Sequence, residues 1–329
     1  MPLFPSFDED KCHLCNFKPN NQNSNSTTRD LILTAAFGSI EGSFAFVKTL
    51  KTTRSKATII ILTDSRTYSK INKSHIESLE NCGASLIDIG VLQFFNANQM
   101  QAIRFYSLQT FLTLFQDKFD RVLVCDLFDV IFQGDPFTSD FNWSRLHLCS
   151  EDVKIADDIY NSQWIKAIEN FDYDSISNNT ILNSGLIYGP PKYIIKLYQL
   201  LLSQFNIRFI SENANDQGYF NKIVHSGELS AAGVEYDIHG IQSPMVTIGL
   251  KQNELKDLQL GKVHHSSWNK PHTLVHQFDR KLEIIADIIN KCPNDGIPYN
   301  IFVRLRYSKE AREKYLGENF KKEKKSKLN

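Results

Sequence analysis

The stretch RVLVCDLFDVIFQGDPF, residues 121–137, sets two carboxylates inside the most apolar part of the chain. Its first residues are typical of a buried strand that ends at Asp126, and Asp129 follows soon after. An unpaired charge buried in an apolar interior costs several kcal/mol, or its pKa shifts until the group is neutral. These two acids must therefore reach solvent, meet a cation or hold a metal ion. The plainer alternative is a capping or turn-forming pair at a strand end.

Other apolar runs place this stretch in a larger pattern. Residues 31–37 and 57–64 are typical of strands buried on both faces, and residues 84–90 follow as a third strand. Apolar positions at helical spacing predict a helix over residues 100–115. Alternating strands and helices predict an α/β, Rossmann-like fold with a mixed, mostly parallel sheet flanked by helices in a single domain. Because ligands of open α/β sheets bind beyond the carboxyl ends of the strands, we expect a binding crevice beside Asp126.

Polar residues outside the opening stretch extend this expectation. Arg104 falls in the early turns of the predicted helix, which starts over the same edge of the sheet, so it either faces the two acids or is a solvated helix cation. An Asn-Ser-Gly sequence at residues 183–185 is typical of a turn. Asp216 either caps a helix beginning near Gly218 or takes part in the site.

Composition narrows the class of protein. The chain has 329 residues, of which 42% are hydrophobic and 22% charged, as in a globular enzyme. Lys+Arg and Asp+Glu both number 37, so no overall charge attracts nucleic acid. No apolar run approaches the ~20 residues of a spanning helix and the amino end lacks a signal-peptide pattern, so we expect no membrane span.

The six cysteines are spread thinly, and three lie in apolar or strand-like segments. This pattern predicts reduced thiols and a reducing compartment. Cys12 and Cys15 form a single CxxC pair, which without a second pair is weak support for zinc or for a redox site. Residues 1–28 are polar and Asn/Ser-rich near their end, which predicts a flexible leader.

The two acids suit a divalent cation. Magnesium and manganese take hard oxygen ligands, and manganese also accepts an imidazole. Asp126, Asp129 and a histidine from residues 264–276 therefore fit such a site, with His276 as the first candidate and His265 as the second. A cation of this kind stabilises a diphosphate that leaves as a glycosidic bond breaks.

Four motifs occur in an order seen in nucleotide-diphospho-sugar transferases: RVLVCDLFDVIFQGDPF, ILNSGLIYG, NDQGYFNKIVHSGEL and LVHQFDRK. With RFYSLQTFL and CSEDVKIADDIYNSQWI, they make the chain resemble the GT-A glycosyltransferase superfamily over roughly residues 30–285. The strand-end motif of that group is similar to DxRD followed by VxFQxDPF. Phe128 stands here at the Arg position, and the acids are spaced DxxD instead of DxD, which leaves the division of metal ligands open.

The resemblance implies a metal-dependent glycosyltransferase, most simply a hexosyltransferase, that moves a sugar from a nucleotide-diphosphate donor to a hydroxyl acceptor on a glycan or protein. It favours a UDP-sugar donor and manganese over magnesium. It also implies a GT-A-like catalytic domain over residues 29–289, with a nucleotide half at 29–137 and an acceptor half at 138–289. Residues 290–329 would form a helical extension, with a helix near residues 309–315 and a basic tail.

The resemblance also assigns roles to residues. Asp126, Asp129 and His276 would hold the metal, Ala35 and Phe37 would border the nucleotide base, and Arg104 would hold the diphosphate. Asn183 would contact the donor, whereas Asp216 and Gln217 would be catalytic, in an inverting or a retaining reaction.

Two other functions stay open. A non-catalytic nucleotide-sugar-binding module would keep Asp126 and bind donor without turnover. A phosphatase with a strand-end Asp nucleophile is less favoured, because that chemistry wants a second Asp two residues on and DLFDV lacks it. Enzymes of the resembling group often work in the Golgi lumen, but the chain shows no anchor, which favours the cytoplasm unless an anchor is missing from this chain.

Overall fold

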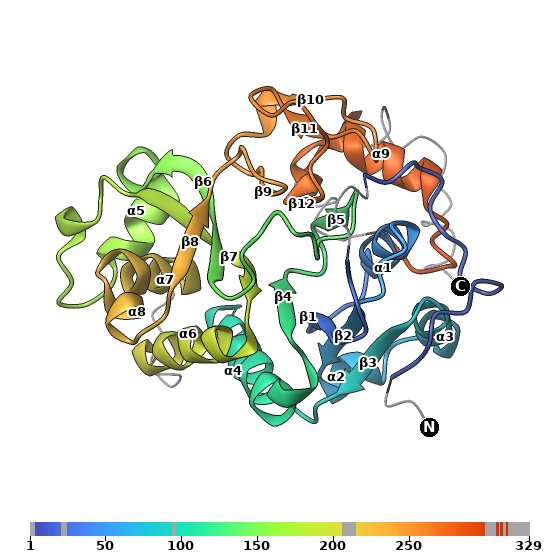
Figure 1. The fold of residues 1–329 in the computed structure, drawn as a ribbon, viewed down its shortest axis with the longest axis horizontal. Helices are drawn as coiled ribbons and strands as arrows, with labels where there is room; N and C mark the ends of the chain where they lie inside the picture. The colour runs from blue at the N-terminus through green and yellow to red at the C-terminus, as the bar shows by residue number, and fades with distance from the viewer. Residues whose placement is uncertain are drawn as a thin grey trace.

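A seven-stranded sheet organises the chain, in the order β3-β2-β1-β4-β7-β6-β8 (Figure 1). The computed structural model describes residues 4–20, 25–93, 97–205 and 215–299, together with residues 307, 308, 310, 311 and 314. The strands of this sheet are β1 Asp30–Ala36, β2 Thr58–Thr63, β3 Ala84–Asp88, β4 Arg121–Cys125, β6 Leu146–Lys154, β7 Thr180–Gly189 and β8 Tyr236–His239. The predicted strands at residues 31–37, 57–64 and 84–90 are thereby confirmed.

Strand directions agree with a mixed, mostly parallel sheet. β1 pairs in parallel with both β2 and β4, β2 pairs in parallel with β3, and β6 pairs in parallel with β8. β7 runs antiparallel to β4 and to β6. From β1 the chain first adds β2 and β3 on one side of the sheet and then returns to place β4 on the other side of β1. The order of strands therefore reverses between β1 and β4. Such a switch point opens a crevice beyond the carboxyl ends of the two strands.

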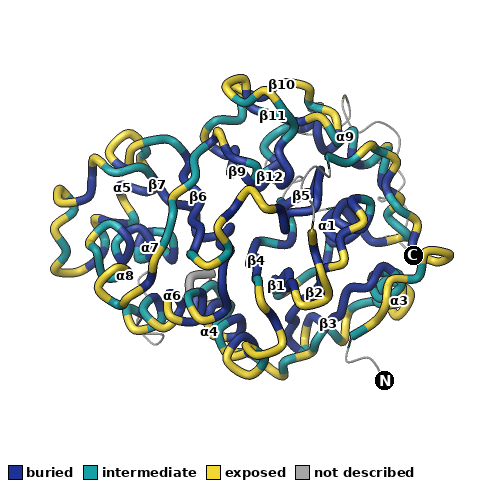
Figure 2. Tube along the Cα trace, viewed as in Figure 1, coloured by how far each residue is buried: buried dark blue, intermediate teal, exposed yellow. Residues whose placement is uncertain are grey.

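Helices cover both faces of the sheet. The helices of the described residues are α1 Ser43–Thr52, α2 Ser65–Tyr68, α3 Lys73–Asn81, α4 Ala97–Phe115, α5 Ile159–Lys166, α6 Pro191–Gln204, α7 Asp216–His225, α8 Glu228–Ala231 and α9 Leu282–Lys291. Alternate strand residues point to opposite faces. Ile32 and Leu123 pack with the α1 side, whereas Leu33 and Val124 pack against α4 and α6. The central strands are accordingly buried along most of their length (Figure 2).

Two small sheets complete the fold. One has the order β5-β12-β9, from β5 Val130–Phe132, β12 Leu274–His276 and β9 Met245–Thr247, and the other pairs β10 Leu255–Lys256 with β11 His264–His265. β5 follows β4 directly in the chain, and its antiparallel partner β12 sets His276 opposite Val130. A residue from late in the sequence is thus carried to the end of β4.

The amino-terminal residues differ from the expected flexible leader and from the expected reduced thiols. Cys12 is bonded to Cys82 and Cys15 to Cys292, while Cys125 and Cys149 are free and buried. Sequence spacing gave no sign of these pairs, because 70 and 277 residues separate their members and only the folded chain brings them together. The CxxC cysteines are therefore cross-links rather than zinc ligands.

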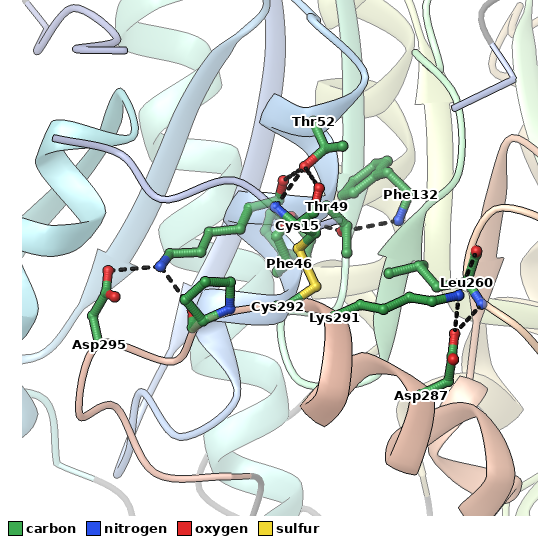
Figure 3. Close-up of a disulfide and its surroundings, with 12 residues drawn as sticks. Cys15, Phe46, Thr49, Thr52, Phe132, Leu260, Asp287, Lys291, Cys292 and Asp295 are labelled. Carbon is green, nitrogen blue, oxygen red and sulfur yellow. Dashed lines mark hydrogen bonds and ion pairs between the residues drawn. A yellow bond between two sulfur atoms is a disulfide. The ribbon is translucent and has the colours of Figure 1, made fainter. Parts of the chain in front are cut away.

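The second disulfide fastens the amino-terminal segment to the body between α1 and the end of α9 (Figure 3). Beside it the backbone N–H of Cys15 donates to Thr52 Oγ1 at 3.0 Å. The ammonium of Lys48 donates to Asp295 Oδ2 at 2.6 Å in the same region. Covalent and polar contacts thus hold residues that their composition alone marks as a loop.

The starts of α6 and α7 show how two helices near the centre of the chain begin, and α7 corrects one expectation. α6 begins at Pro191, whose missing N–H needs no partner in a first turn. The cap of α7 is Asn215, whose side chain accepts from the N–H of Gln217 at 2.9 Å. Asp216 is the first helical residue and not the cap of a helix starting near Gly218, so its carboxylate is available for other contacts.

The expected helix near residues 309–315 lies largely outside the described residues, as does the basic tail. Within the described residues, no helix is both long and apolar enough to cross a membrane.

Candidate active site

A pocket of about 610 Å³ opens beyond the carboxyl ends of β1 and β4, at the switch point of the sheet. Ala35 and Phe37 line it from the end of β1, and Gly38 and Ser39 continue the same wall. The opposite wall comes from the stretch after β4 and from the turn after β12; its lining side chains are Asp126, Leu127, Phe128, Asp129, Gln277, Asp279 and Arg280. The two residues expected to border a bound base thus share one cavity with Asp126 and Asp129, two of the three expected metal ligands.

Asp126, Asp129 and His276 converge beside this pocket. Nε2 of His276 lies 3.6 Å from Asp126 Oδ2 and 3.4 Å from Asp129 Oδ1. One potential ligand atom from each residue lies within 4.8 Å of the others. Asp126 is the residue after β4, Asp129 is the residue before β5, and His276 ends β12, so the pairing of β5 with β12 creates the cluster.

The ligand atoms of the cluster that make no hydrogen bond suit a divalent cation. Nδ1 of His276 lies 3.1 Å from the hydroxyl of Thr247, which fixes the ring, while Nε2 is buried and, without a hydrogen bond to any described atom, faces the carboxylates of Asp126 and Asp129 at ion-pair distance. Oδ1 of Asp129 is also buried without a hydrogen bond. A histidine anchored through one nitrogen and open at the other is the usual form of a metal-ligating imidazole. Two carboxylates and one imidazole together form a set that could hold a metal ion.

Charges in the cluster balance one another. Burial disfavours the protonated form of His276, but Asp129 and Asp126 outweigh it and raise the pKa of the imidazole to about 10. Burial also disfavours ionised Asp126, yet Arg104 and His276 hold its pKa at about 2. Without a cation, a proton on His276 therefore offsets the two carboxylates. A bound cation would replace that proton, as metals do when they bind histidine.

Gly185 packs directly against the cluster. A methyl group added at its Cα would lie 2.5 Å from Asp126 Oδ2 and 2.8 Å from Cε1 of His276. Its carbonyl accepts the N–H of Asp126 at 3.0 Å. The prediction of a turn at residues 183–185 is wrong, because these residues lie inside β7. Glycine is needed here for close approach of the backbone to the two side chains and not for a turn.

Arg104 faces the site and is not a solvated helix cation. Its guanidinium forms an ion pair with Asp126 and lies 3.4 Å from Asp216 Oδ2. α4 carries it over the end of β4, as the topology predicts. Phe128, at the position where the resembling motif has Arg, lines the pocket, and Arg104 together with His276 offsets the charge of Asp126.

Asp216 is held behind Arg104. It is 6% exposed, and the hydroxyl of Ser184 donates to its Oδ2 at 3.0 Å. Burial raises the pKa of Asp216, although Arg104 and Ser184 oppose this shift. Asp216 is thus a buried carboxylate joined to Asp126 through one guanidinium.

Asn183 and Gln217 meet a third acid. Nδ2 of Asn183 donates to Glu151 Oε1 at 2.8 Å, and Nε2 of Gln217 donates to Asn161 Oδ1 at 2.9 Å and to Glu151 at 3.3 Å. Asn183 also accepts the N–H of Gly185 at 2.8 Å, so this polar cluster continues into the metal-binding cluster. The two amides bind the carboxylate of Glu151, whereas the carboxylate of Asp216 faces Arg104.

Sequence reasoning missed two acids. Glu151, near the end of a buried strand in CSEDVKIADD, carries the same signal as Asp126, namely an acid at the end of an apolar run. Burial raises its pKa, against the hydrogen bond from Asn183. Asp279 lines the pocket and is buried, and burial together with repulsion from Asp129 raises its pKa to about 7. Its position three residues after His276 in LVHQFDRK was the available signal.

The sequence matches no protein-family model, and comparison with curated proteins gives no significant match.

Proposed function

We propose that the chain is a metal-dependent glycosyltransferase that moves a hexosyl group from a nucleotide diphosphate to a hydroxyl acceptor. The observation that carries the proposal is the meeting of Asp126, Asp129 and the open Nε2 of His276 beside a pocket at the switch point of the sheet. A cavity of about 610 Å³ is of the size that holds a nucleotide. The GT-A form of the fold is part of the same proposal.

Each part of the pocket suits one part of a nucleotide-sugar. Ala35 and Phe37 offer an apolar wall for a base, for which uracil is the proposal because the resembling group favours it. Asp126, Asp129 and His276 would hold manganese, which when bound neutralises the diphosphate as it leaves. Arg104 adds a fixed positive charge on the same side.

Asp216 is the residue that we place nearest the anomeric carbon. It touches Arg104, so the sugar would follow the diphosphate in the direction of α7. Its raised pKa makes it a better proton acceptor than an exposed aspartate. Gln217 and Asn183 would hold sugar hydroxyls or keep Glu151 in place.

The disulfides bear on location. Disulfides persist in oxidising compartments and are rare in the cytosol. Cys12–Cys82 and Cys15–Cys292 therefore favour the lumen of the secretory pathway over the cytoplasm that the sequence favoured.

A thermal-shift panel tests the proposal. UDP-sugars, GDP-sugars and other sugar nucleotides are added with and without Mn²⁺, and stabilisation is expected only with both. A ligand at 100 times its Kd adds about 2.7 kcal/mol to stability. Asp126→Asn is expected to abolish the shift, whereas Asp120→Asn, which alters an exposed acid paired with Arg29, keeps it.

Donor hydrolysis in the same samples separates an enzyme from a binding module. Turnover that disappears in Asp216→Asn while the thermal shift remains supports the transferase. Binding of donor without turnover in the unaltered protein supports the module instead, and no shift with any sugar nucleotide overturns both.

A further inference from the structure

A second group of side chains that could bind a metal lies on β6 and β8, at one edge of the sheet, and shares no residue with the pocket. It consists of His147 on β6 with Asp237 and His239 on β8, and one ligand atom from each lies within 4.8 Å of the others. His147 pairs in register with Asp237 on the neighbouring parallel strand. Asp237 and His239 are two residues apart, so their side chains share one face of β8.

The ring of His147 is fixed as a ligand would be. Its Nε2 lies 2.9 Å from the backbone carbonyl of Asn142, which can only accept, so this nitrogen carries the proton. Its Nδ1 therefore carries a lone pair, and this atom lies 2.8 Å from Nε2 of His239. A metal-bound histidine characteristically donates its other N–H to a carbonyl or carboxylate in this way.

The guanidinium of Arg145 orients Asp237 through one carboxylate oxygen and leaves the other oxygen available. Nε of Arg145 donates to its Oδ1 at 3.0 Å, while Oδ2 lies 3.9 Å from Nδ1 of His147. The carboxylate is 40% exposed, whereas His147 is 1% exposed. The cluster thus has a buried side that fixes its geometry and an open side through which an ion can enter.

We propose that His147, Asp237 and His239 bind a zinc ion that ties the edge strand β8 to β6. Two imidazoles and one carboxylate are the three-protein-ligand set of zinc sites that keep a water as the fourth ligand. Zinc–nitrogen bonds of about 2.0–2.1 Å in a tetrahedron place two nitrogens about 3.3 Å apart. The imidazoles therefore separate by about half an ångström, and Asp237 Oδ2 moves closer by a similar amount.

The protons balance without a change in charge on the protein. Neutral His239 donates from Nε2 to His147 in the metal-free state. On zinc binding that proton leaves Nε2 while solvent protonates Nδ1 of the same ring. Both lone pairs then face the ion, and the carboxylate supplies one negative charge.

Zinc binding between β6 and β8 would have a structural consequence. β8 is the last strand of the sheet and pairs only with β6 among the described strands. The chain leaves it at His239 and reaches Thr247, whose hydroxyl contacts His276. Zinc at this edge would fix the start of the segment that leads to the first metal-binding cluster.

Zinc titration of the chelator-treated full chain tests the proposal, with bound zinc counted by mass spectrometry and affinity measured by calorimetry. The first cluster is common to all variants, so the comparison is between proteins. His239→Asn is expected to bind one equivalent of zinc fewer than the unaltered protein, and Asp237→Asn, which loses the carboxylate ligand, to bind that equivalent at least about 10-fold more weakly. His264→Asn removes a half-buried histidine that belongs to neither cluster and whose Nδ1 lies 2.9 Å from the Lys262 carbonyl, and should change neither value.

Cobalt gives an independent signature, since tetrahedral Co²⁺ absorbs strongly in the visible. That band is expected in the unaltered protein and His264→Asn but not in His239→Asn. Asp237 is partly exposed, so Asp237→Asn serves if His239→Asn fails to fold. Equal zinc stoichiometry and affinity in all variants would overturn the proposal and leave a histidine–histidine hydrogen bond.

Discussion

A single methyl group at Gly185 should disable the metal-binding cluster. The added carbon of Gly185→Ala would lie 2.5 Å from Asp126 Oδ2 and 2.8 Å from Cε1 of His276. Non-bonded heavy atoms approach no closer than about 3.5 Å without repulsion, so the carboxylate must move by about 1 Å. Gly185 has no positive φ, so alanine itself is compatible with the backbone and the effect comes from the collision alone.

The size of the expected loss in Mn²⁺ affinity follows from the displacement of the Asp126 and His276 side chains. Disturbing the surroundings of a metal ligand costs about 10- to 100-fold in affinity, which is about 1.4–2.8 kcal/mol. Calorimetry with Mn²⁺ measures this loss, and denaturant unfolding verifies that the variant stays folded. Gly240→Ala is the matched control, because its methyl collides with the carboxylate of Asp152, outside the cluster. An unchanged Mn²⁺ affinity in Gly185→Ala would refute the placement of Asp126 and His276 as ligands.

Three further changes test other parts of the structure. Arg104→Gln removes the cation beside Asp126. It should weaken the binding of UDP in saturating Mn²⁺ about 10- to 100-fold, because charge-assisted contacts contribute about 1.5–3 kcal/mol. Calorimetry measures this change, and an affinity equal to that of the unaltered protein would contradict a role for Arg104 in binding the diphosphate. Asn215→Ala removes the cap of α7 and should lower the free energy of urea unfolding by about 1 kcal/mol, a loss that must appear if the cap forms. Burial lowers the pKa of Lys51 from 10.5 to about 8, so the folded state holds fewer protons than the unfolded state between those pH values and its stability rises there with pH. Relative to Lys51→Met, the unaltered protein should gain about 3 kcal/mol between pH 7 and 10.5, and a constant difference would show an ordinary pKa.

The parts of the fold that depend on local pattern were predictable. Continuous apolar runs identified β1, β2 and β3, because a strand covered on both faces cannot alternate. The apolar face of α4 placed Phe105 and Leu108 in the core, where they are buried. From this order the crevice at Asp126 followed, and Arg104 was found there.

The parts that depend on distant contacts were not predictable. Nothing near residues 183–185 distinguishes a turn glycine from one that faces Asp126 and His276, since the distinction lies in what packs against it. The cysteine pairs fail for the same reason, because the amino-terminal segment must fold back before Cys15 meets Cys292. Glu151 was overlooked although it shares the signal of Asp126, because its amide partners, Asn183 and Gln217, come from distant parts of the chain.

Alternation on β8 was also a missed signal. Residues 236–239, YDIH, place Asp237 and His239 on one face, but their partner His147 is known only from the pairing of β8 with β6. That pairing joins segments about 90 residues apart, which a local pattern does not reveal.

The most direct test of the central claim is anomalous diffraction from a crystal soaked with Mn²⁺ and UDP. One manganese peak is expected, bonded to Nε2 of His276, to a carboxylate oxygen of Asp126 or Asp129, and to the diphosphate. A crystal in which these side chains bind no manganese, or in which the nucleotide lies away from them, would contradict it.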